Sequence, residues 1–93
     1  MYVLLVYDIP TKSKEGEKVL RNTFKISKKY LHHIQNSVFE GQLSKAKIKA
    51  LQNDLNQYIR QDTDSVILFK SRNKKWLDKE FWGKEDDKTS NIL

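Results

Sequence analysis

The feature that most constrains this chain is an unbroken apolar and aromatic run at its start, Tyr2-Val-Leu-Leu-Val-Tyr7. Such a run predicts a central β-strand covered on both faces, because a strand with one wet face alternates apolar and polar residues. Pro10 stops the strand, since proline has no backbone N–H for the sheet ladder. Side chains alternate along a strand, so Asp8 is predicted at the strand's exit, on the face shared by Leu4 and Val6.

A chain this small has few residues with which to cover both faces of the central strand. Its 93 residues fit one domain with a thin core. The sequence holds no cysteine for disulfides and no Cys/His cluster suited to structural zinc. We therefore expect oligomerisation to stabilise the fold, and a two-fold homodimer is the commonest form of it.

Residues 13–30 change to helical periodicity, with an apolar stripe that we expect to pack on the sheet. The stripe consists of Val19, Leu20, Phe24, Ile26 and Tyr30. On the opposite side, cations recur at steps of four, three, four and three, which aligns them along one ridge of the helix. This basic ridge consists of Lys14, Lys18, Arg21, Lys25 and Lys28.

The charge of the chain is concentrated on this helix. The formal net charge is +6, and residues 12–29 alone hold seven basic and two acidic residues. A charge run is often only a solvated helix face. A local basic excess also attracts polyanions, of which nucleic-acid backbones are the commonest in a cytosol. The pattern therefore makes nucleic acid a candidate partner.

The rest of the first seventy residues alternates between extended and helical patterns. Residues 31–43 predict either one bent strand or two short strands meeting around Asn36-Ser37, and Gly41 indicates a bulge or a close approach. Ser44 is predicted to cap a helix that runs to Arg60, where the cation suits the negative end of the helix dipole. Residues 65–69 predict another strand.

This order of elements predicts the fold class α+β. A β-α-β-β-α-β chain forms a ferredoxin-like sandwich, with two helices on one face of an antiparallel sheet. The other face is then free for a second copy of the chain, which again predicts a homodimer. We assign residues 1–70 to this domain.

The composition changes after residue 70. Residues 71–83 hold two tryptophans and a phenylalanine, Trp76, Phe81 and Trp82. So apolar a segment is expected to dock, most simply along the sheet edge of the partner chain, whereas base stacking on nucleic acid is the less favoured alternative. Residues 84–93 are polar without periodicity, which predicts a mobile tail.

No catalytic cluster stands out from the residues alone. The chain has no Gly-rich phosphate loop and no Glu-x-x-His or paired-carboxylate motif. His32 and His33 point to opposite faces of a strand, so we expect one packed and one exposed histidine rather than a metal pair. Ser37 would need a base nearby, and only His33 offers one, so a positioning role is preferred. Asp8 by itself is typical of a turn cap.

Three segments read together resemble a known family. They are Met1-Tyr-Val-Leu-Leu-Val-Tyr-Asp-Ile9, Ile34-Gln-Asn-Ser-Val-Phe-Glu-Gly-Gln-Leu43 and Asp64-Ser-Val-Ile-Leu-Phe69. In order and spacing the first seventy residues resemble CRISPR-associated protein 2. The strand ending in Tyr-Asp, followed later by Gln-x-Ser-Val-Phe-x-Gly, is the specific part of the pattern.

The resemblance implies a homodimeric scaffold that joins two dimers of the CRISPR integrase, CRISPR-associated protein 1, and holds double-stranded DNA during spacer acquisition. It also implies a metal-dependent endonuclease acting on DNA or single-stranded RNA, in which Asp8 and its twin across the dimer axis bind one Mg²⁺. The near-site residues carried over are Tyr7, Ser37 and Phe39, and for Phe39 a role in the core alone is the alternative.

The sequence departs from the family at two positions. The family often carries arginine where this chain has Lys18 and His33. Lysine keeps the charge but loses the bidentate fork, and the His33 position loses a permanent cation. Arg21 is therefore the better phosphate contact in this region, beside the rest of the basic ridge.

Three functions stay open from the sequence: a DNA-binding adaptor, a metal-dependent nuclease, and a toxin-like or RNA-binding ribonuclease of the same fold outside CRISPR immunity. A single ion between two carboxylates is a sparse site, so the scaffold role is preferred over catalysis. No apolar run is long enough to span a membrane, and the first residues form a strand rather than a signal peptide. A cytoplasmic location is therefore expected.

Overall fold

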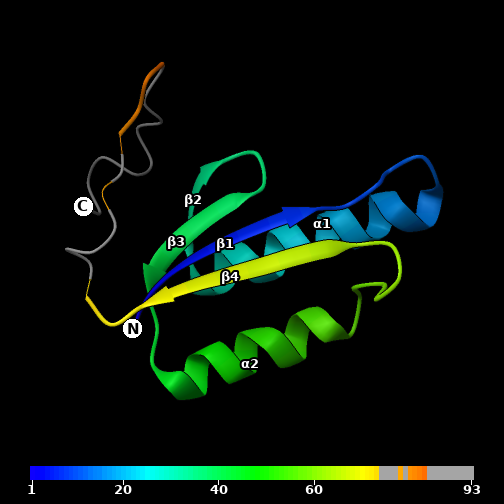
Figure 1. The fold of residues 1–93 in the computed structure, drawn as a ribbon. Helices are drawn as coiled ribbons and strands as arrows, with labels where there is room; N and C mark the ends of the chain where they lie inside the picture. Colours follow the sequence, from blue (N-terminus) through cyan, green and yellow to red (C-terminus); the bar gives the residue numbers. More distant parts are fainter. Residues whose placement is uncertain (74–77, 79, 84–93) are drawn as a thin grey trace.

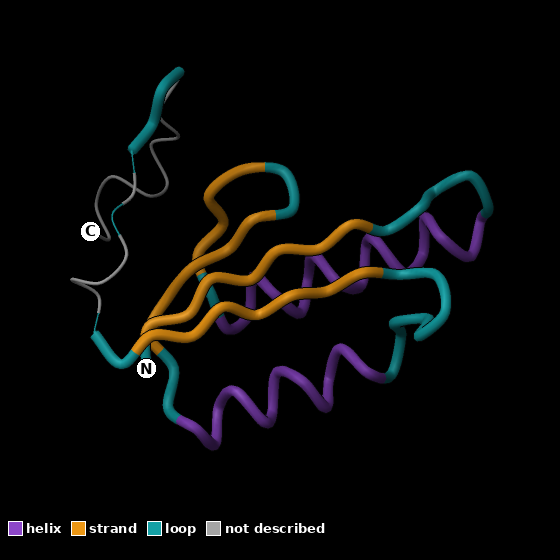
Figure 2. The backbone as a smooth tube through the Cα atoms, viewed as in Figure 1, coloured by secondary structure: helices purple, strands orange, loops and turns teal. Residues whose placement is uncertain are grey.

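The computed structural model describes residues 1–73, 78 and 80–83. Its elements follow the predicted β-α-β-β-α-β order: β1 (Tyr2–Asp8), α1 (Lys14–Tyr30), β2 (His32–Gln35), β3 (Val38–Gln42), α2 (Lys45–Asn56) and β4 (Ser65–Ser71). The four strands form one antiparallel sheet in the order β2-β3-β1-β4. Both helices lie on the same side of it (Figures 1 and 2). This is the ferredoxin-like α+β fold that the sequence predicted, with β4 reaching Ser71, just past the boundary expected at residue 70.

Helix α1 begins and ends close to the predicted residues. The Ser13 hydroxyl accepts a hydrogen bond from the Gly16 N–H at 3.0 Å, which caps the helix. Acidic residues in the first turn and lysines in the last turn complement the helix dipole. At the far end the Leu31 N–H bonds to the Ser27 carbonyl at 2.8 Å.

The buried face of α1 differs from the predicted apolar stripe. Besides Val19, its fully buried residues are small: Gly16, Thr23 and Ser27. The other members of the stripe are only half-buried and pack against the margin of the core. Small side chains let the helix lie close to the rest of the fold, so they occupy the line of contact and the larger side chains flank it.

Residues 31–43 form a hairpin of two short strands rather than one bent strand. Asn36 adopts a left-handed conformation with φ 36, which is common for asparagine in tight turns. A register shift lies between His33 and Gln35. At Gly41 the structure has the close approach rather than the bulge, because an added Cβ would lie 3.0 Å from the Leu31 side chain.

Helix α2 is capped by Ser44 as predicted, but it ends at Asn56, before the expected end at Arg60. The N–H groups of Tyr58 and Ile59 both bond to the Leu55 carbonyl, so the chain tightens and leaves the helix. The prediction that Arg60 complements the dipole of this helix is wrong. Its guanidinium instead binds Asp64.

The two faces of the sheet have different cover. On the helix face, Val3, Leu5, Tyr7 and Phe39 are buried in one core with both helices. The opposite side, which we call the open face, carries half-buried Leu4, Val6 and Val38 beside Ile67 and Phe69, which are 48% and 54% exposed. The helices thus cover one face only. The cover predicted for the second face is not supplied by either helix.

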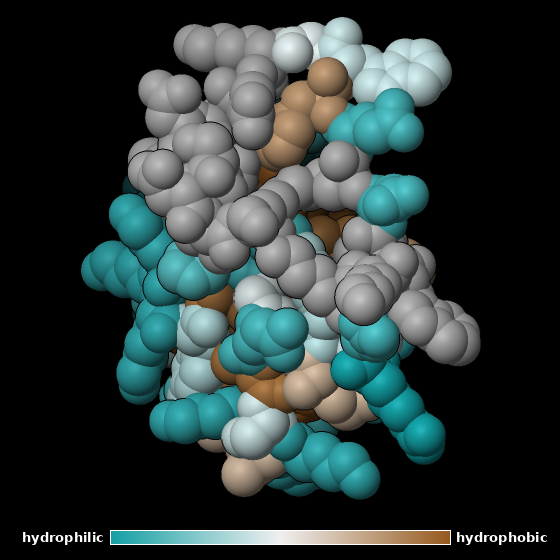
Figure 3. All heavy atoms as spheres, turned by 90° about the vertical axis from the view of Figure 1, so that its left-hand side faces the viewer, coloured by the Kyte–Doolittle hydropathy of each residue, from teal (hydrophilic) through white to brown (hydrophobic). Residues whose placement is uncertain are grey.

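The described part of the C-terminal segment lies beside the open face. Residues 80–83 line a hollow of about 400 Å³ together with Leu4, Ile34, Gln35 and Val38. On the side that carries the N-terminus, Figure 3 shows hydrophobic surface between hydrophilic side chains. Docking of this segment on a partner chain stays a prediction. Trp76 and the predicted tail, residues 84–93, lie outside the described residues.

None of the described helices is both long and apolar enough to cross a bilayer.

Candidate nucleic-acid interface

Asp8 is the last residue of β1 and its side chain is exposed. It lies opposite Ser65 of β4 and belongs to the open face, next to its apolar residues. The carboxylate accepts no hydrogen bond from any other residue that the structure describes, so the turn-capping role suggested by sequence is not what it does here. Its oxygens are available to a ligand at the margin of an apolar surface.

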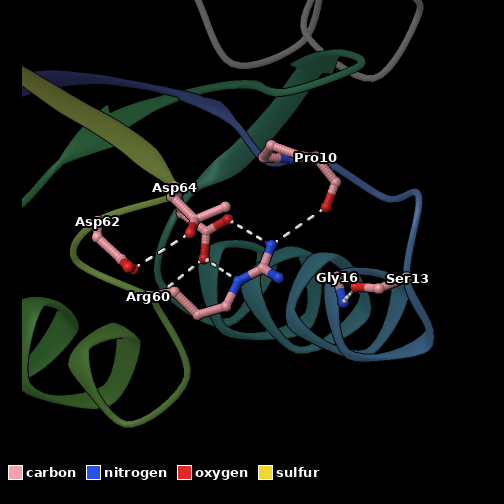
Figure 4. Close-up of polar contacts among 7 residues, drawn as sticks. Pro10, Ser13, Gly16, Arg60, Asp62 and Asp64 are labelled. Atoms are coloured by element: carbon pink, nitrogen blue, oxygen red, sulfur yellow. Dashed lines mark hydrogen bonds and ion pairs between the residues drawn. The ribbon is translucent and has the colours of Figure 1, made fainter.

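The loop that follows Asp8 is held at the Pro10 carbonyl. Arg60 Nη2 donates a hydrogen bond to this oxygen at 3.1 Å and another to Asp64 Oδ1 at 2.8 Å. Figure 4 shows the guanidinium between the two acceptors. On its other side the same carbonyl approaches Gly16 so closely that an added Cβ would lie far inside contact distance. These contacts join the exit of β1 to α1 and to the loop before β4.

We call the contacts of Arg60 with Asp64 and with the Pro10 carbonyl the Pro10 clamp, and the ion pair in it is shielded from water. The side chain of Asp64 is fully buried and that of Arg60 is 19% exposed. The Arg60 backbone N–H donates to Asp64 Oδ2 at 2.8 Å, and Nε donates to the same oxygen at 3.0 Å. Hydrogen bonds from Arg60 stabilise the carboxylate, so the pKa of Asp64 is lowered from its ordinary value.

None of the predicted near-site residues lies on the sheet face that carries Asp8: Tyr7 and Phe39 are on the opposite face, and Ser37 is in the β2–β3 turn. Phe39 is completely buried, with its ring centroid 6.0 Å from Tyr7 and 5.6 Å from Phe24. It is a core residue on the face opposite Asp8. Tyr7 shares that face, and its backbone N–H bonds to the Ser37 carbonyl at 3.2 Å, which ties the β2–β3 turn to the end of β1. Burial raises the pKa of Tyr7 to about 12.

The histidines behave as the sequence predicted, one packed and one exposed. His32 is exposed, whereas His33 packs its ring 4.9 Å from Phe39 and 5.0 Å from Phe24. His33 Nε2 lies 2.9 Å from the Asn36 carbonyl. That contact engages the nitrogen with the backbone, and Ser37 has no hydrogen-bonded base among the described residues. A serine nucleophile is therefore not assembled in the described chain.

The basic ridge lies along α1 with all five of its members exposed. None of the five forms an ion pair with a carboxylate of another described residue; the lysine that does so is Lys29, 4.0 Å from Asp54. Lys28 Nζ lies 5.8 Å from the centroid of the Phe24 ring. The ridge is thus a row of exposed cations without an ion-pair partner among the described residues, which leaves it available to a polyanion.

A hollow of about 520 Å³ lies beside the middle of this ridge, and we call it the α1 hollow. It is formed by α1, the end of β1 and the β2–β3 turn, and it is lined by Tyr7, Leu20, Arg21, Phe24, Lys25, Asn36 and Ser37. The hollow was not predicted from the sequence. The one trace of the hollow in the sequence is that apolar and basic residues lie next to each other twice on α1, at Leu20-Arg21 and at Phe24-Lys25.

A divalent cation would find one carboxylate per chain at the predicted site. The described part of the chain contains no group of three or more His, Cys, Asp or Glu side chains placed to hold an ion. Asp8 has the oxygen donors that Mg²⁺ prefers, together with solvent access for the waters that complete its shell. The residues therefore fit a hard cation only as half of a site.

Comparison with known proteins identifies the family. A family model described as CRISPR associated protein Cas2 matches residues 1–79. The chain belongs to the Cas2 family. It is 54% identical over 93 residues to a protein of Fusobacterium nucleatum named CRISPR-associated endoribonuclease Cas2, covering all of this chain and 87% of that protein. A protein of the same name from Methanosarcina acetivorans is 34% identical, with both chains covered completely.

Solved Cas2 structures share the fold. Streptococcus pyogenes Cas2 superposes with a TM-score of 0.73 at 31% identity, covering 87% of this chain and all of that one. A second Cas2 crystal structure gives a TM-score of 0.79 at 34% identity, covering 94% of this chain and 91% of that one. The resemblance that the sequence showed is confirmed. The family match and the named relatives support a CRISPR-related function for this chain.

Proposed function

We propose that this chain forms a homodimer that binds nucleic-acid backbones and serves as the scaffold of the CRISPR integrase during spacer acquisition. A metal-dependent phosphodiester hydrolysis at paired Asp8 residues is its secondary activity. The observation that carries the proposal is the position of Asp8, an exposed carboxylate on the same face as the half-exposed apolar residues Ile67 and Phe69. The apolar surface that a second copy would bury and the Asp8 carboxylate that a second copy would pair with therefore lie on the same face of the sheet.

The open face supports the dimer. Ile67 and Phe69 are about half exposed and lie across from Val6 and Leu4 on the same face. Contiguous apolar surface on a small protein commonly marks an interaction site, and a two-fold dimer buries the same patch on both copies. Since Asp8 is part of this face, a two-fold axis near the end of β1 would bring the two Asp8 carboxylates together.

Two facing carboxylates repel each other, which favours a divalent cation between them. Asp8 of each chain would hold Mg²⁺, and the bound ion would supply an activated water and charge stabilisation at a phosphate. The Pro10 clamp contributes by fixing the exit of β1 and hence the position of Asp8. One ion with two protein ligands is a sparse site, which is why the scaffold role takes precedence.

Relatives support the catalytic part of the proposal. The similar proteins of F. nucleatum and M. acetivorans are both named endoribonucleases. RNA is therefore the first substrate to test for cleavage. The basic ridge supports binding of both RNA and duplex DNA, because contacts with phosphates are largely independent of base sequence.

The test is the variant Asp8→Asn, with Asp62→Asn, an exposed aspartate in the loop before β4, as the control. We expect Asp8→Asn to abolish Mg²⁺-dependent cleavage of single-stranded RNA and duplex DNA. Binding of duplex DNA and spacer integration with the neighbouring integrase should persist. Lost integration with retained DNA binding would overturn the precedence of the scaffold role, and cleavage that survives in Asp8→Asn would remove Asp8 from the reaction.

A second candidate is a toxin-like ribonuclease of the same fold outside CRISPR immunity. The family match and the relatives named as CRISPR-associated favour the CRISPR function over it. The gene neighbourhood tests this choice directly. An adjacent integrase gene and repeat array support the scaffold, and the scaffold proposal fails if the purified chain does not associate with the integrase.

A further inference from the structure

The α1 hollow is an open, mostly apolar depression beside the basic ridge. Its volume of about 520 Å³ is in the usual range for ligand pockets, and Tyr7, Leu20 and Phe24 supply apolar and aromatic wall. The β2–β3 turn contributes Asn36 and Ser37 to its lining. Neither of these two side chains is hydrogen-bonded to another described residue.

The Tyr7 hydroxyl is the second observation that points to a ligand. Tyr7 is only 3% exposed, it lines the hollow, and its hydroxyl makes no hydrogen bond with any residue the structure describes. The hydroxyl is not among the buried side-chain atoms that lack a partner, so it stays accessible from the hollow although the rest of the side chain is covered. A ligand in the hollow can therefore accept its proton in place of water. Burial raises its pKa to about 12, so the hydroxyl keeps its proton near neutral pH and can donate it.

Two cations of the basic ridge border the same hollow. Arg21 and Lys25 are one helical turn apart, exposed, and among its lining residues. A ligand that suits the whole site needs an anionic group to bind Arg21 and Lys25. It also needs a flat, largely apolar group with polar edges to occupy the interior of the hollow. A nucleotide within a strand has this combination of a phosphate and a base.

We propose that the α1 hollow binds one unpaired nucleobase of a single strand whose phosphates lie on the basic ridge. The inference rests on the proposed function, because it requires the ridge to bind nucleic acid. In this arrangement the base packs against the Phe24 side of the hollow, and its polar edge accepts a hydrogen bond from the Tyr7 hydroxyl. The open face stays available for the dimer, since Tyr7 and Phe24 belong to the helix face of the sheet.

The hollow gives the chain a way to discriminate single strands from duplexes. A paired base in a helix is stacked and cannot enter a pocket of this kind, whereas a strand end or loop can extend its base. Contacts with the phosphate backbone alone would bind single strands and duplexes with affinities that differ only through their charge density. The hollow thus adds a preference for unpaired positions to a ridge that reads no sequence.

The experiment compares a fluorescent single-stranded oligouridine with an abasic oligomer of the same length and charge, in EDTA so that no metal-dependent cleavage occurs. Both are made as RNA and as DNA, since the base is common to them and the two arms show which backbone is accepted. We expect the base-bearing strand to bind about five- to a hundredfold tighter, which is the usual value of stacking one base on aromatic side chains.

Two variants test whether this ratio arises in the hollow. Tyr7→Phe removes the hydroxyl but keeps the ring, and Leu20→Phe fills the hollow; each should move the affinity ratio toward one. Lys14→Ala is the control, because Lys14 is on the ridge but does not line the hollow. It should weaken both strands alike and leave the ratio unchanged. Thermal melting of each variant establishes that it is folded.

The outcomes separate this inference from the proposed function. Binding of both strands with equal affinity overturns the base site and leaves the ridge intact, whereas no binding of either strand at low salt overturns both. If the affinity ratio of the base-bearing to the abasic strand is unchanged in Tyr7→Phe and Leu20→Phe, the base binds outside the hollow and the inference is wrong. If Leu20→Phe changes the oligomeric state instead, a second copy covers the hollow and the inference is again wrong.

Discussion

The guanidinium of Arg60 forms a bidentate pair with the carboxylate of Asp64, from Nε to Oδ2 at 3.0 Å and from Nη2 to Oδ1 at 2.8 Å. Nη2 also donates to the Pro10 carbonyl at 3.1 Å. One side chain therefore links the loop after α2 to the exit of β1, where Asp8 lies. The stability of this corner of the fold and the position of the candidate site are coupled.

Replacing Asp64 by asparagine should lower the free energy of unfolding by about 1.5–3 kcal/mol, the usual range for a hydrogen bond to a charged group. The carboxylate is fully buried, so its loss leaves Arg60 without its counter-charge. Denaturant unfolding at pH 7 measures the effect. Asp62→Asn, at an exposed carboxylate bonded to the Thr63 hydroxyl, should change stability by no more than about 0.5 kcal/mol.

The stabilisation from Asp64 should depend on pH in one direction. Its pKa is lowered in the folded state below the ordinary value of 3.8, so the contribution is present above that value. It is lost as the pH falls below 3.8 and through the folded pKa. The stability difference between the wild type and Asp64→Asn should therefore be constant near neutrality and shrink under acid. A difference that grows below pH 4 would contradict this account.

Gly16→Ala should destabilise the protein by about 1–3 kcal/mol, although alanine is ordinarily the better helix former. The added methyl would collide with the Pro10 carbonyl, which is backbone and cannot move aside like a flexible side chain. Gly83→Ala is the matched control, because a Cβ there meets no atom within 4 Å. The measurement is thermal unfolding of both variants, and a Gly16→Ala protein as stable as the wild type would show that the loop yields.

Phe69→Asp should weaken the proposed dimer at least about tenfold, equivalent to about 1.4 kcal/mol. It introduces a charge on the exposed apolar part of the open face, where Phe69 of the edge strand β4 is 54% exposed in the single chain. Asn53→Asp adds the same charge at an exposed position of α2 and should leave association unchanged. Sedimentation equilibrium at several concentrations distinguishes the two. Equal association of both variants would exclude the open face as the interface.

Arg21→Ala should reduce the salt dependence of duplex DNA binding. Each phosphate contact contributes about 0.9 to the slope of log affinity against log salt, so the slope should fall by about that amount without a change in sequence preference. Lys49→Ala, an exposed lysine on α2 outside the ridge, is the control. A wild-type affinity that does not respond to salt would exclude the basic ridge as the contact surface.

Features that depend on local periodicity were predictable. The alternation along β1 assigns Asp8 to the same face as Leu4 and Val6, as the registers with β3 and β4 confirm. The helical spacing of the basic ridge keeps its members exposed, because one side of a surface helix is always turned to solvent. The Cas2 pattern was recognisable for a related reason, since its motifs coincide with strand ends.

Features that depend on contacts between distant segments were not predictable from local patterns. Arg60 has the spacing of a helix-terminal cation, yet a bidentate partner after the turn and the Pro10 carbonyl fifty residues earlier engage it instead. Phe39 was carried over as a near-site residue, but it packs into the core on the face opposite Asp8, the face on which the alternation along β1 also places Tyr7. The α1 hollow likewise exists only because the β2–β3 turn comes back beside α1.

The sequence by itself determined the order of the strands and helices, the face of each side chain along them, the basic ridge and the family. These properties follow from dihedral preferences and from repeats of two or 3.6 residues, which operate within one element. Tertiary structure alone decided where α2 ends, which small residues α1 buries, how the exit of β1 is held, and which polar groups line the α1 hollow. Those features arise from packing and hydrogen bonds between elements that are distant in the sequence. Such elements come into contact only when the chain has folded.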